Sequence, residues 1–144
     1  MAQAKSKMII LRGQSGAGKT TLATKAFSDY VRCSADDHFM KNGRYVFDRY
    51  ELQVAHDYYY VKAKKALIEG KNVIIDNTNR KLDEFSRYLR LKEFTSEIVV
   101  AKVVSSFTSD KNIPPHVIEI FHREYQRFPG EVEITLEGIM KTRS

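Results

Sequence analysis

One stretch of the chain places glycines, a lysine and a hydroxyl at a spacing that suits the binding of phosphate. Residues 13–20 read Gly-Gln-Ser-Gly-Ala-Gly-Lys-Thr and fit the pattern Gly-x-x-x-x-Gly-Lys-Ser/Thr. The glycines let the backbone wrap a phosphate with its N–H groups turned inward, and the N-terminus of a following helix adds a positive dipole. In such a loop Lys19 reaches the β and γ oxygens of a nucleoside triphosphate, and the Thr20 hydroxyl ligates Mg²⁺. The predicted nucleotide-binding residues are Gly13, Ser15, Gly16, Ala17, Gly18, Lys19, Thr20 and Thr21.

A pair of carboxylates follows the second apolar run of the chain, in the stretch Ser34-Ala35-Asp36-Asp37. A carboxylate at a strand end beside the phosphate loop can accept the proton of a hydroxyl that attacks the γ-phosphate. An Asp pair in an arbitrary sequence more often caps a helix or lies in a solvated loop. The position of this pair directly after a strand favours the catalytic interpretation.

A third polar strand end reads Asp76-Asn77 after the apolar run Val73-Ile74-Ile75. A mechanical ATPase usually carries a Glu in the place of Asn77, where it activates water. The sequence also lacks the Asn-Lys-x-Asp stretch that guanine-specific switch proteins carry. The pattern therefore favours a kinase, which protects its phosphoryl group from water.

The elements that must hold these residues alternate between strands and helices. Apolar runs predict strands at 8–11, 31–34, 72–76 and 98–104, and helical spacing predicts helices at 20–27, 52–67, 82–89 and 117–128. This alternation predicts an α/β fold of three layers, the P-loop NTPase or kinase type, with a central parallel sheet and helices on both faces. Ligands then bind at the carboxyl ends of the strands.

Length and composition set the remaining bounds. The 144 residues are expected to form one domain, 1–144, in which the alternating tail 131–144 can add an edge strand. The net charge of +6 favours a polyanionic or phosphorylated partner. The single cysteine, Cys33, excludes an internal disulfide and fits a reducing compartment. Without a membrane-length apolar run or a secretory signal, we expect a cytoplasmic protein, in the host cytoplasm if a phage encodes it.

Several stretches together resemble, in order and spacing, the P-loop kinases of the phage-type 5′-polynucleotide kinase family. They are residues 13–20, Ser34-Ala35-Asp36-Asp37, Tyr45-Val46-Phe47, Ala55-His56 and Asp76-Asn77-Thr78-Asn79. The most similar branch occurs in ubiquitin-ligase-binding proteins, and the match runs from about residue 8 to 128. The resemblance implies ATP- and Mg²⁺-dependent transfer of the γ-phosphate to a hydroxyl of nucleic acid, classically the 5′-OH of DNA or RNA.

The resemblance also implies roles for individual residues. Asp36 would be the general base, and Lys19 would serve the phosphates. Thr20 and Asp76 would hold the metal. The residues assigned to the acceptor side are Asp37, Asn77, Thr78 and Asn79.

The sequence departs from this family at two places. His38 and Phe39 stand where the family places an Arg for the acceptor phosphate, so that contact has moved to Arg44 or Arg49 or is absent. The expected lid, residues 105–113, offers only Lys111, whereas the family's lid supplies arginines.

Three explanations for the lid stay open. Lys111 acts as the catalytic cation of the lid, or Arg123 or Arg127 reaches in from the predicted helix, or turnover is slow. Arg123 and Arg127, with His116 nearby, form either a solvated basic face or a track for a nucleic-acid backbone.

Aromatic residues and His56 give weaker indications. The run 58–60 of three tyrosines is more typical of packing than of base stacking. His56, in a predicted helix beside an apolar stripe, is more typical of a packed structural histidine than of a site residue.

Two other functions fit the same residues. One is a kinase of a small hydroxyl metabolite or nucleoside, which would show no salt-sensitive affinity for oligonucleotides. The other is a nucleotide-dependent binding protein that has lost efficient catalysis, which would bind ATP and phosphorylate no acceptor.

Overall fold

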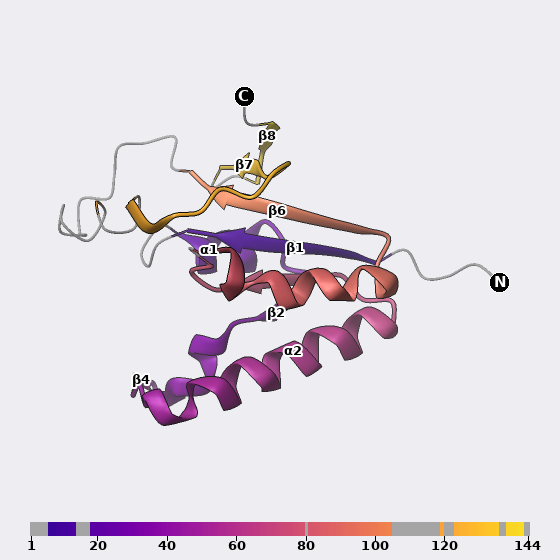
Figure 1. Cartoon of the computed structure of the whole chain (residues 1–144). Coiled ribbons are helices and arrows are strands. Elements are labelled where there is room, and N and C mark those ends of the chain that lie inside the picture. The colour runs from indigo at the N-terminus through magenta and orange to yellow at the C-terminus, as the bar shows by residue number, and fades with distance from the viewer. Residues whose placement is uncertain are drawn as a thin grey trace.

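The described part of the chain, residues 6–13, 18–79, 81–104, 119, 123–135 and 138–142, builds a six-stranded sheet in the computed structural model (Figure 1). The strands lie in the order β2-β5-β1-β6-β7-β8. Their bounds are β1 Lys7–Arg12, β2 Val31–Cys33, β5 Val73–Asp76, β6 Glu97–Val103, β7 Val132–Ile134 and β8 Met140–Thr142. The four predicted strands correspond to β1, β2, β5 and β6, and the tail supplies β7 and β8.

The direction of the strands brings several chain turns to one edge of this sheet. Neighbouring strands from β2 to β7 run parallel, and β8 runs antiparallel to β7. The register sets Leu11 of β1 opposite Asp76 of β5 and Ala101 of β6. The carboxyl ends of β1, β2 and β5 therefore lie together, at the left-hand end of Figure 1. The glycine-rich stretch and both Asp-containing stretches leave the sheet at this edge.

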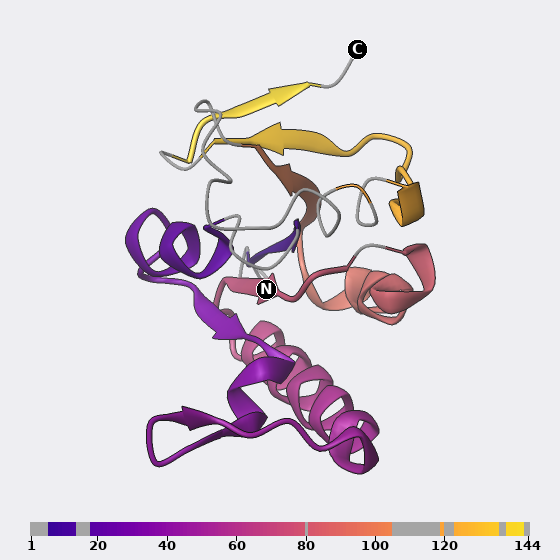
Figure 2. The same cartoon turned by 90° about the vertical axis from the view of Figure 1, so that its left-hand side faces the viewer.

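The two faces of the sheet are covered by different helices. Along β1, Met8 and Ile10 join one buried cluster with α2 (Leu52–Ile68), whereas Ile9 and Leu11 join another with α1 (Lys19–Lys25). Figure 2 shows α1 on one side of the sheet and α2 on the other. Because these strands are buried on both faces, their sequences read as nearly continuous apolar runs. The predicted fold class is confirmed.

The helix predicted at 82–89 forms as 3-10 turns instead of an α-helix. These turns are η3 (Leu82–Glu84) and η4 (Ser86–Phe94). The buried residues Phe85, Tyr88 and Leu91 recur every three positions, which is the number of residues in one 3-10 turn. Of the described helices, none has the length and apolar character needed to cross a membrane.

The prediction of a helix over 117–128 is wrong at the C-terminal end. Part of this range lies outside the described residues. Glu119 and residues 123–124 are helical, whereas residues 125–128 are not. Phe128 precedes Pro129, which disfavours helical backbone, and the Phe128 N–H donates to Glu131 Oε1 at 2.8 Å. Arg123 and Arg127 therefore do not share a helical face.

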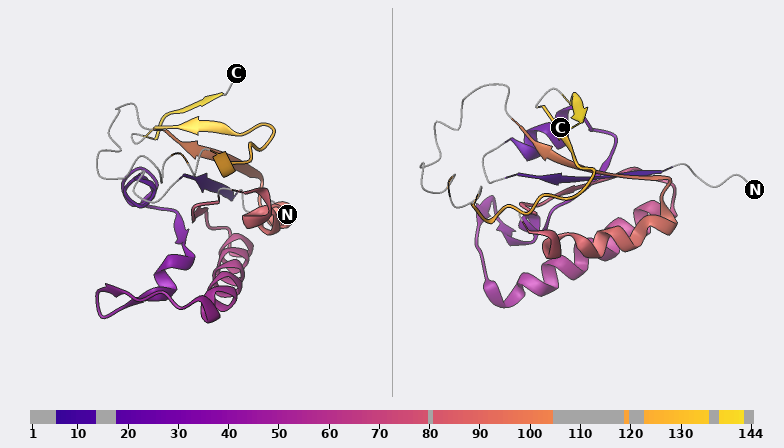
Figure 3. Two further views of the ribbon diagram at one scale, coloured as in Figure 1. Left: turned by 60° about the vertical axis from the view of Figure 1, so that its left-hand side comes forward. Right: turned by 45° about the horizontal axis from the view of Figure 1, so that its top comes forward.

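A small hairpin between β2 and α2 was not predicted. It consists of β3 (Met40–Lys41) and β4 (Arg44–Tyr45), between η1 (Ala35–Phe39) and η2 (Arg49–Glu51). Its turn residues, Asn42 and Gly43, have φ angles of 52° and 76°, the left-handed backbone that a two-residue type I′ turn requires. Figure 3 shows the hairpin projecting from the body of the fold beside the first turn of α2.

A fully buried ion pair joins β1 to the C-terminal part of the chain. Arg12 Nη1 lies 2.7 Å from Glu131 Oε1, and neither side chain is exposed. Arg12 Nε donates to the carbonyl oxygen of Asn79 at 2.7 Å, and its guanidinium lies between the rings of Phe85 and Tyr125, 4.6 Å and 4.0 Å from their centroids. The pair thus fixes the end of β1 against the loop after β5 and the segment before β7.

We expect Glu131→Ala to lower the free energy of unfolding by about 3 kcal/mol, because it leaves the Arg12 charge buried without its carboxylate. Denaturation in urea would measure this change. The matched control is Glu97→Ala, which removes a surface partner of Lys7 that is 55% exposed and 3.9 Å away. The control should change the same free energy by less than about 0.5 kcal/mol. Equal losses in the two variants would contradict the prediction.

Candidate active site

Lys19 is the first residue of α1 and directly follows Gly18, the last glycine of the glycine-rich stretch. Gly18 precedes it with a φ of 94°, a left-handed backbone that glycine adopts without strain. Lys19 is buried, and its Nζ donates to the Gly13 carbonyl oxygen at 2.7 Å. Burial lowers the pKa of the Lys19 ammonium, and the negative charges of Asp76 and Asp36 oppose this shift. The cation therefore lies within the electrostatic reach of both carboxylates that the sequence singled out.

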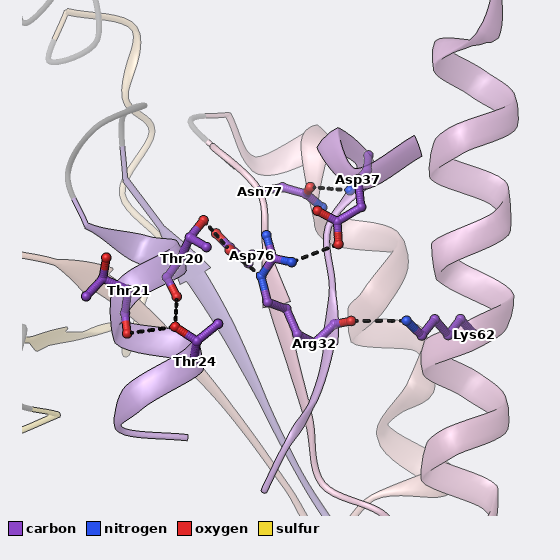
Figure 4. Close-up of polar contacts among 9 residues, drawn as sticks. Thr20, Thr21, Thr24, Arg32, Asp37, Lys62, Asp76 and Asn77 are labelled. Atoms are coloured by element: carbon purple, nitrogen blue, oxygen red, sulfur yellow. Dashed lines mark hydrogen bonds and ion pairs between the residues drawn. The ribbon is translucent and has the colours of Figure 1, made fainter. Parts of the chain in front are cut away.

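Thr20 in the first turn of α1 and Asp76 at the end of β5 face each other, as Figure 4 shows. Thr20 Oγ1 donates to Asp76 Oδ2 at 3.0 Å. Asp76 is buried at the end of β5, and Arg32 of β2 donates from Nε to the same Oδ2 at 2.8 Å. Arg32 Nη1 also donates to Asp37 Oδ2 at 2.7 Å. Arg32 therefore connects the buried carboxylate to the Asp pair, a role that the sequence analysis missed.

The hydroxyl and carboxylate of this pair suit the binding of Mg²⁺. Mg²⁺ prefers oxygen ligands and is usually held by one or two carboxylates together with phosphate oxygens and water. In the described ranges, no cluster of three or more His, Cys, Asp or Glu residues could hold a metal ion. An ion at Thr20 and Asp76 would thus take its other ligands from a nucleotide and water.

The two carboxylates of the Asp pair point to different partners. Asp37 binds Arg32, whereas Asp36 is exposed and lines a cavity. The Tyr45 hydroxyl lies 3.4 Å from Asp36 Oδ1. Asp36 is therefore the member of the pair that a molecule in the cavity could reach.

The cavity has a volume of about 560 Å³ and lies at the carboxyl end of β5, beside α2 and η3. A volume of this size holds a nucleoside or a sugar. Its titratable lining groups are three carboxylates, one guanidinium and one imidazole. The lining residues are Ala35, Asp36, Leu52, Gln53, His56, Asn77, Thr78, Asn79, Asp83, Glu84 and Arg87.

The side chains of Asn77 and Asn79 hold the backbone around this cavity. Asn77 Oδ1 accepts from the Ala35 N–H at 2.9 Å, and Asn79 Nδ2 donates to the Leu11 carbonyl oxygen at 2.8 Å. The Thr78 carbonyl oxygen accepts from the Gly13 N–H at 3.1 Å. The stretch 76–79 thereby ties together the ends of β1, β2 and β5. All three residues also line the cavity, and their contact with an acceptor stays a prediction.

Other predicted site residues lie apart from the cavity or outside the described ranges. Arg44, Arg49, Arg123 and Thr21 are exposed and do not line it. The residues outside the described ranges are Ser15, Gly16, Ala17, Lys111 and His116.

His56 and Arg87 are cavity residues that the sequence analysis did not assign to the site. Arg87 Nη1 lies 2.9 Å from Asp57 Oδ1, and its guanidinium lies 4.3 Å from the centroid of the Tyr60 ring. His56 is half-buried on α2. Its Ala-His motif was noted in the sequence, but Arg87 carried no recognisable signal. The structure therefore adds an imidazole and a guanidinium to the wall opposite the strand ends.

The fold and this geometry define a class of protein. A parallel sheet, the stretch Gly-x-x-x-x-Gly-Lys-Thr after β1 and an Asp carboxylate beside the Thr are the features of a kinase-like P-loop domain. The chain belongs to the AAA_33 family, described as an AAA domain, whose family model matches residues 8–111.

One human protein is similar to part of the chain. NEDD4-binding protein 2 of Homo sapiens is 38% identical over 90 residues, which cover 60% of this chain and 5% of that protein. The chain therefore corresponds to about 5% of the length of that relative.

Solved structures share the fold. A chain in the structure of the Pnkp1/Rnl/Hen1 complex has a TM-score of 0.60 and 21% identity, over 90% of this chain and 43% of that one. A gluconokinase from Sinorhizobium meliloti 1021 has a TM-score of 0.51 and 14% identity, over 96% of this chain and 86% of that one. The TM-scores establish a common fold. Sequence identities this low leave the acceptor of this chain open.

We expect His56 to titrate with a pKa below the ordinary histidine value of about 6.5. Burial lowers this pKa, and the positive charge of Arg87 lowers it further. Proton NMR of the imidazole, with His56→Gln to assign the signal, would measure it. Arg87→Met should raise the midpoint because it removes the neighbouring positive charge. A midpoint above 6.5, or one that Arg87→Met leaves in place, would contradict this account.

Proposed function

We propose that the protein is an ATP- and Mg²⁺-dependent kinase that transfers the γ-phosphate to a hydroxyl of nucleic acid, namely the 5′-OH end of DNA or RNA. The observation that carries the proposal is the placement of Asp36. Its carboxylate lines the cavity while its charge acts on the buried ammonium of Lys19. A hydroxyl in the cavity would thus reach a proton acceptor, Asp36, whose charge also acts on the lysine proposed to hold the phosphates.

The reaction uses each of these groups once. Lys19 holds the β- and γ-phosphate oxygens and offsets the negative charge that develops on them. Asp36 accepts the proton of the acceptor hydroxyl as its oxygen forms a bond to the γ-phosphorus, and the bond from that phosphorus to the β–γ bridging oxygen breaks to release ADP. When bound at Thr20 and Asp76, Mg²⁺ would neutralise phosphate charge. Lys111 stays the candidate for a further cation from the lid.

The choice of nucleic acid as acceptor rests on the sequence. The stretches 34–37 and 76–79 resemble those of the 5′-polynucleotide kinases, and the net charge of +6 suits a polyanion. The side chains of Asn77 and Asn79 make buried hydrogen bonds that fix the loop after Asp76.

The lining of the cavity favours a second candidate, a kinase of a small uncharged hydroxyl compound such as a sugar or nucleoside. Asp36, Asp83 and Glu84 supply three carboxylates against one guanidinium, from Arg87. Such a surface disfavours a phosphate inside the cavity. Arg44 and Arg49, which could hold an acceptor phosphate, lie outside it.

Incubation with Mg²⁺ and γ-labelled ATP would test both candidates on one panel of acceptors. The panel contains 5′-OH DNA, 5′-OH RNA, a nucleoside and common sugars. We expect label on an oligonucleotide and a loss of at least about 100-fold in kcat for Asp36→Asn, because that change removes the proton acceptor.

The control variant is Asp29→Asn, the same chemical change at an exposed turn outside the cavity, which should leave kcat unchanged. Label confined to a small molecule would replace the first candidate with the second. ATP binding without any labelled acceptor would contradict both and support a nucleotide-dependent binding protein. Full activity in Asp36→Asn would contradict the assignment of the base.

A further inference from the structure

Exposed aromatic rings gather on the hairpin and the turn that follows it. Tyr45 and Phe47 are 53% and 52% exposed, and Tyr50 in η2 is 85% exposed. Aromatic residues are enriched at binding interfaces relative to the rest of a protein surface. We call residues 40–50 the hairpin surface.

Two rings of the hairpin surface, Tyr45 and Phe47, pack on a buried ring. Phe39 is buried, and its ring centroid lies 6.1 Å from that of Tyr45 and 5.0 Å from that of Phe47. The Val46 N–H donates to the Phe39 carbonyl oxygen at 2.7 Å, which fixes the segment between the two rings. Tyr45 and Phe47 therefore pack on Phe39 and keep about half of their surface open, whereas Tyr50 is more exposed and has the Arg49 guanidinium 5.5 Å from its ring centroid. Rings that are already ordered lose little conformational entropy when a flat ligand stacks on them.

Cations lie among these rings. Lys41, Arg44 and Arg49 are exposed, and none of them has a carboxylate within ion-pair distance in the described ranges. The carboxylate of the hairpin surface, Asp48, accepts from the Tyr50 N–H at 2.9 Å, and the next carboxylate along the chain, Glu51, lies 3.0 Å from His38. The hairpin surface is thus aromatic and positively charged.

The hairpin surface also leads to the cavity. The Tyr45 hydroxyl is 3.4 Å from Asp36 Oδ1, and Leu52, directly after η2, lines the cavity. Figure 1 shows the hairpin at the same end of the molecule as the carboxyl ends of the strands. A chain lying on the hairpin surface would therefore bring its end to Asp36.

We propose that the hairpin surface binds single-stranded nucleic acid, whose bases stack on Tyr45, Phe47 and Tyr50 while Lys41, Arg44 and Arg49 contact its phosphates. Aromatic platforms interleaved with cations bind single strands in this way, and paired bases cannot present the same faces. The direction of the strand, with its 5′ end at Asp36, rests on the proposed function. The arrangement also reconciles a polyanionic acceptor with the acidic cavity, because only the terminal hydroxyl-bearing unit enters the cavity and the phosphates stay on the hairpin surface.

Binding without ATP tests this proposal apart from catalysis. The probe is a twelve-nucleotide DNA or RNA strand with a free 5′-OH and a 3′ fluorophore, followed by fluorescence anisotropy. Phe47→Ala and Tyr50→Ala should each raise Kd by about 5- to 100-fold. Phe47→Tyr and Tyr50→Phe keep a stacking ring and should bind as the unchanged protein does. A duplex of the same sequence should bind more weakly than the strand.

Two further variants separate the contribution of the hairpin rings from that of an exposed tyrosine elsewhere and from that of the hairpin cations. Tyr58→Ala removes a tyrosine in the middle of α2 that is 59% exposed, close to the exposure of Phe47, and should leave Kd unchanged. The double variant Arg44→Gln and Arg49→Gln should reduce the slope of log K against log salt by about 1.4, the value for two phosphate contacts to a single strand. Circular dichroism of each variant would confirm that the fold is retained.

The outcomes distinguish this proposal from the proposed function. Equal Kd values for the unchanged protein and the Phe47→Ala and Tyr50→Ala variants, equal binding of duplex and strand, or no binding of any oligonucleotide would overturn the hairpin proposal. Strand binding through the hairpin without labelled oligonucleotide would support it and contradict the kinase assignment. If the oligonucleotide is labelled and its KM is unchanged in both alanine variants, the kinase assignment would be supported and the hairpin proposal contradicted.

Discussion

The structure depends on the burial of two opposite charges, Arg12 and Glu131. Removing a guanidinium and a carboxylate from water is costly, and their attraction offsets this cost only when their remaining hydrogen-bonding groups are also satisfied. Arg12 bonds to the carbonyl of Asn79 and lies between two aromatic rings, and Glu131 accepts from the Tyr125 hydroxyl and the Phe128 N–H. Because Arg12 immediately precedes Gly13, this arrangement holds the entrance of the phosphate loop against the loop after β5.

The candidate site follows from this constraint and from the direction of the sheet. Parallel strands bring three polar turns to one edge, and side-chain hydrogen bonds then lock the turns to one another. Asn77 binds the turn after β2, and Asn79 binds the end of β1. Arg32 links Asp76 with Asp37, which leaves Asp36 as the carboxylate of the pair that opens into the cavity. In the proposed function, this arrangement separates a phosphate side at Lys19 from an acceptor side at Asp36.

Much of this could be predicted from the sequence, because buried parallel strands read as continuous apolar runs, the buried residues of α2 recur at helical spacing, and the phosphate loop has a specific spacing. Other features depend on contacts that no local pattern records. Arg12 and Arg32 look like ordinary polar residues at strand positions, and their partners lie far along the chain. The 3-10 turns of η4 share enough spacing with an α-helix to be mistaken for one. The hairpin could have been predicted, since Asn42-Gly43 is a characteristic turn sequence. The charge of the cavity wall depends on how η3 and α2 pack together, which the sequence does not reveal.

The distance between Arg12 and Glu131 along the chain has a consequence for folding. The two residues are 119 positions apart, and β1 pairs with β5 and β6, which both come much later in the sequence. Contacts of such long range must close large loops of unfolded chain before they contribute stability, which slows folding relative to a chain held by local contacts. Until residue 131 arrives, Arg12 has to remain solvated and the end of β1 cannot settle into its final surroundings.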